Sequence, residues 1–209
     1  MYTAIYLAVW FAGSAMMIKE GLWSNTIALV NIVISGLVAF GFYSPIAIYF
    51  DELTNGEYTY LLDFVCIWTL FVIAMVVCRT LTGGFSRTRM RFKNPVEPVL
   101  GPLMAVLDSW VMAAFVMATL HTSPMPKDAF SSGLIYSDNE VESNGVESKW
   151  ALFNPDLGWL RFVERVTPVD SFGAREGGGF SAKAFVRIYA DHREKYDRAK
   201  PPWIRVRRG

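Results

Sequence analysis

The chain has 209 residues, of which 53% are hydrophobic, 19% are charged and 15% are aromatic. This composition excludes a disordered or collagen-like chain, and two cysteines are too few for a disulfide scaffold. A formal net charge of +1 argues against a nucleic-acid-binding protein. The charge is unevenly distributed, because residues 1–121 contain 13 charged residues and residues 122–209 contain 26. We therefore expect two different parts that meet near His121.

Four segments of the first part are apolar enough to be membrane spans, since a helix needs roughly 20 mostly apolar residues to cross the hydrocarbon core. They lie at about 1–18, 22–50, 58–82 and 99–122. A soluble helical protein would need polar faces at a 3.6-residue period, and residues 26–50 show none. The first segment lacks the basic start of a cleaved signal peptide. These patterns predict an all-α membrane protein with a four-helix transmembrane domain at residues 1–121.

The orientation of these spans follows from Lys and Arg in the short links between them. The first link contains Lys19, and the second, residues 51–59, contains acidic residues but no Lys or Arg. The third link contains Arg87, Arg89, Arg91 and Lys93. We therefore predict that the first and third links are cytoplasmic, and that both termini are outside (N-out and C-out).

The second part divides into a polar linker at residues 122–149 and an extracytoplasmic tail at residues 150–209. The pair Asn154-Pro155 predicts the start of a helix, whose apolar face would lie on the outer membrane leaflet or pack against the transmembrane domain. A second amphipathic helix is predicted from about Ser181 to Lys200. The apolar face of this second helix contains Phe185, Ile188, Tyr189, His192 and Tyr196.

Small residues within the spans predict close packing between helices, because they let helix backbones approach each other in lipid. Gly36 lies in the second span, and Gly101 and Ala105 are four residues apart on one face of the fourth. We interpret these three residues as helix-packing positions.

Asp108 is the residue that most suggests a function within the membrane. It lies roughly 13 Å into a hydrocarbon core of about 30 Å, where an ionisable group is costly and faces the bundle interior or water. Asn31 in the second span lies at about the same depth, so we predict an intramembrane polar pair of Asp108 and Asn31. The pair could be a proton or ion relay, or a structural hydrogen bond between the second and fourth spans.

No arrangement of residues is typical of an enzyme. Gly177–Gly179 lacks the Lys-Ser/Thr that follows a phosphate-binding loop. Two histidines cannot form a zinc site with Cys66 and Cys78, because both cysteines are inside a predicted span. We therefore expect no catalytic residue, no cofactor and no metal site, and interpret the protein as not an enzyme.

Three stretches of the first part resemble the colicin V production protein family. KEGLWSNTIALVNIVISGLVAF is similar to the family's glycine-containing turn and second span, and LLDFVCIWTLFVIAMVVCRTL resembles its third span. EPVLGPLMAVLDSW is similar to the start of its last span, with Leu100-Gly101 as the most recognisable pair. The resemblance covers about residues 3–121.

The resemblance implies a four-helix protein of the bacterial inner membrane that is linked to toxin export and envelope physiology, without an established reaction. The chain differs from the family near the start of the last span, where Gly and Arg are usual and Ala105, Asp108 and Ser109 stand here. The tail is also longer than in compact members. We therefore carry no role of a family residue across to Asp108.

Three functions are compatible with these patterns. The first is a non-enzymatic membrane protein that assists toxin export or envelope maintenance through protein partners. The second is a subunit of an oligomeric transporter or channel that uses the intramembrane Asp108. The third is a structural accessory subunit of a larger membrane complex. The expected partners are the lipid bilayer, other membrane or periplasmic proteins and further copies of the chain, but not nucleic acid.

Overall fold

The computed structural model describes residues 2–54, 58–85, 96–124, 154–167 and 180–199, and every regular element within these ranges is a helix. The elements are α1 (Tyr2–Met17), α2 (Leu22–Leu53), α3 (Thr59–Phe85), α4 (Val96–Thr119), the short 3-10 helix η1 (Leu120–Thr122), α6 (Pro155–Val166) and α7 (Ala182–Ala199). The prediction of an all-α protein is confirmed for this part of the chain. The six predicted helices are all present, close to their expected ends.

Three segments are long and apolar enough to cross a membrane, namely Leu22–Leu53, Leu61–Gly84 and Val96–Thr122. α1 is apolar but shorter, since its 16 residues extend for about 24 Å at a rise of 1.5 Å per residue. Large apolar side chains are exposed along the long helices, as lipid-facing positions require. On α3 they are Val65, Val72, Ile73, Val76, Val77 and Leu81. The structure thus supports three of the four predicted spans by length, and the crossing of α1 stays a prediction.

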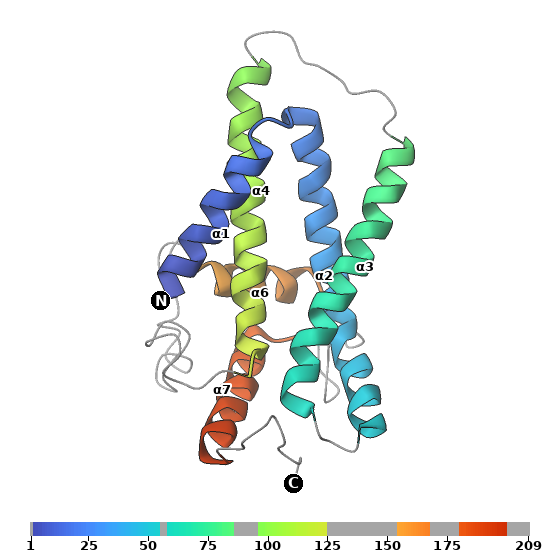
Figure 1. Cartoon of the computed structure of the whole chain (residues 1–209), viewed down its shortest axis with the longest axis vertical. Helices are drawn as coiled ribbons and strands as arrows, with labels where there is room; N and C mark the ends of the chain where they lie inside the picture. The colour runs from blue at the N-terminus through green and yellow to red at the C-terminus, as the bar shows by residue number, and fades with distance from the viewer. Residues whose placement is uncertain (1, 55–57, 86–95, 125–153, 168–179, 200–209) are drawn as a thin grey trace.

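The long helices form one bundle in which α1 packs against α4, and α2 packs against both α3 and α4 (Figure 1). α2 and α4 run in the same direction, and α1 and α3 run in the opposite one. We call the end with the turn between α1 and α2 the link end. The opposite end, where α2 and α4 finish and α7 lies, is the tail end.

The link end is held together by a tight turn and by one buried amide. Gly21 has φ +84°, and a Cβ atom there would lie 2.7 Å from Glu97 Oε1, so the turn requires glycine. The adjacent backbone packs on Gly101, where a Cβ atom would lie 3.5 Å from the backbone nitrogen of Leu22. The Nδ2 group of fully buried Asn25 donates to the carbonyl of Gly101 at 3.1 Å and to that of α1 residue Met17 at 3.3 Å. These contacts join α1, α2 and α4.

α6 crosses the bundle and contributes to its main hydrophobic core (Figure 1). The helix starts at Pro155 with Asn154 at the N-cap position, as predicted. Its buried apolar residues are Leu157, Trp159, Leu160 and Val163. They join the fully buried rings of Phe40 and Phe115, whose centroids lie 5.9 Å apart. Of the two alternatives for this helix, the structure has the one in which it packs against the bundle.

α7 lies at the tail end and buries one face (Figure 1). Phe185 and Tyr189, both on the predicted apolar face, are 4% exposed, whereas Ile188 and His192 on that face are only partly buried. Arg193 is also buried, at 7% exposed, a position that the apolar pattern did not predict. The side chain of Tyr196 lies outside the described residues.

Candidate functional site

Asp108 lies inside the bundle, as predicted, and its side chain is completely buried. Neither oxygen of its carboxyl group has a hydrogen-bond partner among the described residues. A buried polar group without a partner costs about 1–3 kcal/mol, and more when it is charged. On α4, the large apolar residues that are exposed all lie before Asp108 in the sequence. The part of α4 that follows Asp108 is covered by neighbouring helices, including α1 and α6.

Asn31 is close in depth to Asp108 but does not bond to it. The contact between Asn25 and Gly101 sets the register of α2 against α4, and Asn31 lies six residues beyond Asn25 while Asp108 lies seven beyond Gly101. The Asn31 amide instead donates to Thr82 Oγ1 of α3 at 3.1 Å. Asn31 and Asp108 therefore lie at similar depths, as predicted. The predicted hydrogen bond between them is absent, because the side chain of Asn31 is directed to α3.

The small residues allow three close contacts of different kinds. A Cβ atom on Gly36 would lie 2.4 Å from Trp159 of the tail helix α6 and 3.3 Å from Phe115 of α4, so this glycine makes room for both helices. Gly101 lies against the turn at the link end, and Ala105 is completely buried one helical turn later. Gly13 of α1 lies against Ser109, since a Cβ atom there would be 3.0 Å from Ser109 Oγ.

A buried polar pair connects the end of α4 to the start of α6. His121 Nε2 and Asp156 Oδ2 share a hydrogen bond of 2.8 Å, and both side chains are completely buried. Removing one member of such a buried pair lowers the stability of the fold by about 3–5 kcal/mol, because the other member is left buried without a partner. Sequence patterns do not predict this pair, since 35 residues separate its members and no short motif links them.

A second buried polar group connects α7 to α2 and α3. The hydroxyl of Tyr189 donates to Asp63 Oδ2 at 2.9 Å. The hydroxyl oxygen of Tyr43 lies 3.4 Å from the hydroxyl oxygen of Tyr189. Nearby, Thr59 donates to Asp51, which joins the start of α3 to the end of α2. Asp51 and Asp63 both lie near the ends of predicted spans. These polar contacts therefore lie at the tail end of the bundle.

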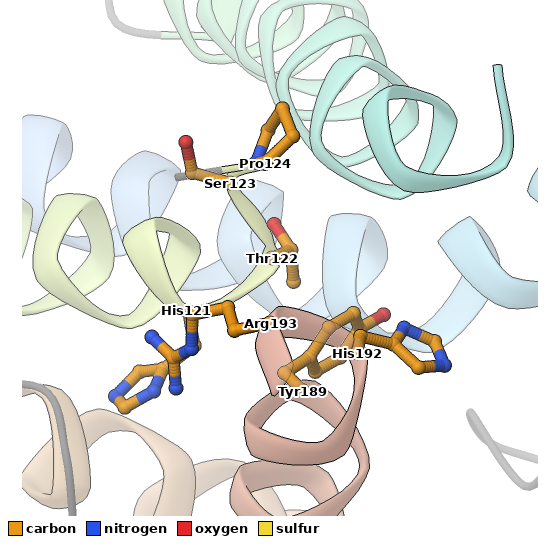
Figure 2. A pocket seen from close by; sticks show the side chains of 7 residues that line it. All are labelled: His121, Thr122, Ser123, Pro124, Tyr189, His192 and Arg193. Carbon is orange, nitrogen blue, oxygen red and sulfur yellow. The ribbon is translucent and has the colours of Figure 1, made fainter. Parts of the chain in front are cut away.

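The pocket between η1 and α7 is too small for a ligand. Figure 2 shows it among His121, Thr122, Ser123, Pro124, Tyr189, His192 and Arg193. Its volume of about 10 Å³ is close to the minimum of roughly 10–15 Å³ that one water molecule requires. We therefore interpret this region as the interface between the bundle and α7.

Several predicted features lie outside the described residues. They include the basic link with Arg87, Arg89, Arg91 and Lys93, and most of the linker at residues 122–149. In the described ranges, no three or more His, Cys, Asp and Glu residues are grouped to hold a metal ion. Cys66 and Cys78 are both free thiols.

The fold and the comparison with known families together identify the class of protein. Three long apolar helices with exposed apolar faces define a helical membrane protein. The chain belongs to the family described as Colicin V production protein, whose sequence model matches residues 2–137. This match covers well over half of the chain and confirms the resemblance found in the spans. The comparisons with curated proteins and with solved structures gave no match.

Proposed function

We propose that this protein is a non-enzymatic, multi-pass protein of the bacterial inner membrane that assists toxin export or envelope maintenance by binding protein partners. Membership of the colicin V production family supports the general role. The distribution of Lys and Arg supports the N-out and C-out orientation. Binding to partners is supported by the way in which the tail is held on the bundle.

The observation that carries the proposal is that α6 and α7 are fixed to the bundle while the exposed face of α7 is charged. Aromatic packing and the buried His121–Asp156 and Tyr189–Asp63 hydrogen bonds hold the two helices. The exposed face of α7 contains Lys183, Arg187, Asp191 and Lys195. A fixed, mostly basic surface at the tail end suits an acidic surface of a periplasmic or membrane protein.

Charge reversal on α7 tests this proposal. A strain without the gene is complemented with the wild-type protein, with an Arg187→Glu/Lys195→Glu variant, or with an Arg187→Lys/Lys195→Arg control that keeps both charges. Toxin in the culture medium, survival of envelope stress and proteins that co-purify in mild detergent are measured. We expect the α7 variant to lose complementation and the co-purifying partner, and the control to keep both. Full function of the α7 variant would contradict the proposal.

The buried carboxyl group supports a second candidate, a subunit of an oligomeric transporter or channel. Asp108 lies in the bundle interior without a hydrogen-bond partner among the described residues, a position typical of proton relays in membrane proteins. Proton flux into proteoliposomes tests this candidate. A flux that is lost in the Asp108→Asn protein would favour it over the first.

A further inference from the structure

A groove with a volume of about 530 Å³ lies at the link end, between α1, α2 and α3. Figure 1 shows α2 and α3 moving apart toward this end. The volume falls within the range of about 300–1,000 Å³ that is typical of small-molecule sites. One wall is the segment of α2 from Trp23 to Ile32, and another is the segment of α3 from Met75 to Gly83. The groove is distinct from the charged surface of α7.

Two buried carbonyl groups in the lining of the groove indicate a ligand that donates hydrogen bonds. Asn25 and Asn31 are 0% and 5% exposed, and their Nδ2 groups donate to other helices. The Oδ1 atom of each side chain has no hydrogen-bond partner among the residues that the structure describes. Since an amide oxygen can only accept, the missing partner must carry an N–H or O–H group.

Charged residues of both signs also line the groove. Arg79 is exposed in its lining and can bind a phosphate with two parallel hydrogen bonds. Glu20, on the turn between α1 and α2, also lines it and can pair with an ammonium group. A ligand with both a phosphate and an ammonium group would satisfy this arrangement.

Apart from Ser24 and Thr82, the rest of the lining is apolar, and the groove lies within the membrane-spanning segments. Ile27, Ala28, Ile32 and Met75 contribute its apolar surface. Arg79 and Gly83 belong to the apolar segment Leu61–Gly84, which is long enough to cross a membrane. A ligand that reaches this groove from the bilayer would bring apolar chains as well as a polar headgroup.

We propose that the groove binds a phospholipid with a phosphoethanolamine headgroup. Its phosphate binds Arg79, its ammonium group donates to the unpartnered Oδ1 of Asn31, and the negative charge of Glu20 on the turn favours a cationic headgroup in the groove. Its acyl chains lie along Ile32 and Met75. Phosphatidylcholine has the same net charge but no N–H group in its headgroup, so it cannot supply the missing donors.

The test uses the delipidated full-length chain in detergent and measures its unfolding temperature with each lipid added. Phosphatidylethanolamine at a hundredfold excess over Kd should raise this temperature, on the order of 5–10 °C. Phosphatidylcholine should raise it much less. Equal effects of the two lipids, or no effect of either, would overturn the proposal; the latter would indicate that a protein segment occupies the groove.

Two glycines provide a matched pair of variants. A Cβ atom on Gly83 or Gly84 meets nothing within 4 Å, but only Gly83 lines the groove. Gly83→Trp should fill the groove and abolish the effect of phosphatidylethanolamine, whereas Gly84→Trp should keep it. Arg79→Gln should also abolish the effect, and Lys19→Gln should not. If Gly83→Trp and Arg79→Gln respond to the lipid as the wild type does, the proposal is wrong.

Discussion

Asn25 and Asp108 are two completely buried polar residues with opposite environments. The Nδ2 group of Asn25 donates to carbonyl groups of α1 and α4, so the burial of this nitrogen is compensated and the side chain fixes the helices relative to each other. The carboxyl group of Asp108 has no such compensation among the described residues. A residue that costs stability without supporting a contact is a better candidate for a function than for a structural role.

We therefore expect Asp108→Asn to leave the unfolding temperature in detergent unchanged or higher, because it replaces an ionisable group by a neutral one of similar shape. Asn25→Leu is the control and should lower stability by about 1–2 kcal/mol through the loss of two interhelical hydrogen bonds. Thermal unfolding of the purified proteins measures both effects. A clear loss of stability in Asp108→Asn would instead assign a structural role to the carboxyl group.

At the scale of the elements, the contact between α2 and α6 determines how the tail packs. Trp159 lies over Gly36 and is surrounded by Phe40 and Phe115, at ring-centroid distances of 6.2 and 5.6 Å. The indole is 4% exposed, so it has little room to move. Any side chain at position 36 must therefore displace α6 from the bundle.

Gly36→Ala should destabilise the packing of α6 by about 1–3 kcal/mol, because the added methyl group overlaps the indole. Hydrogen exchange of the α6 backbone amides should become faster. Gly84→Ala is the control, since a Cβ atom there meets nothing within 4 Å and this residue does not line the groove. In a Trp159→Ala background, Gly36→Ala should lower the stability of the α6 packing by much less. Equal costs in the two backgrounds would show that the contact does not exist.

At the scale of the whole molecule, the two ends of the bundle differ in character. The link end carries the turn between α1 and α2, and the tail end carries α7 and the buried polar groups around Asp63 and His121. With the predicted orientation, the link end faces the cytoplasm and the tail end faces the outside. The charged face of α7 would then be accessible to periplasmic partners.

Thiol labelling in intact cells tests this orientation. In a background with Cys66→Ala and Cys78→Ala, we expect Lys127→Cys to react with a membrane-impermeant reagent from outside. Arg89→Cys in the basic link should react only after the membrane is opened, because Lys and Arg in short links stay cytoplasmic. Labelling of both positions from the same side would contradict the predicted orientation.

Local patterns in the sequence are enough to predict the helices and the approximate positions of their ends. Long apolar segments predict α2, α3 and α4, and Asn154-Pro155 predicts the first residue of α6, because span length and helix-start preferences are local properties of the chain. Family membership could likewise be inferred from these segments and from Leu100-Gly101. In the fold, Gly101 packs against the turn at Gly21.

Which side chains meet depends instead on how the helices pack together. Asn31 bonds to Thr82 and not to Asp108, and Gly36 accommodates Trp159 of the tail. His121 pairs with Asp156 across 35 residues of sequence. Depth in the membrane can be counted from the sequence, but the direction of a side chain around its helix depends on which neighbours pack there. That choice is made by long-range packing, which no local pattern encodes.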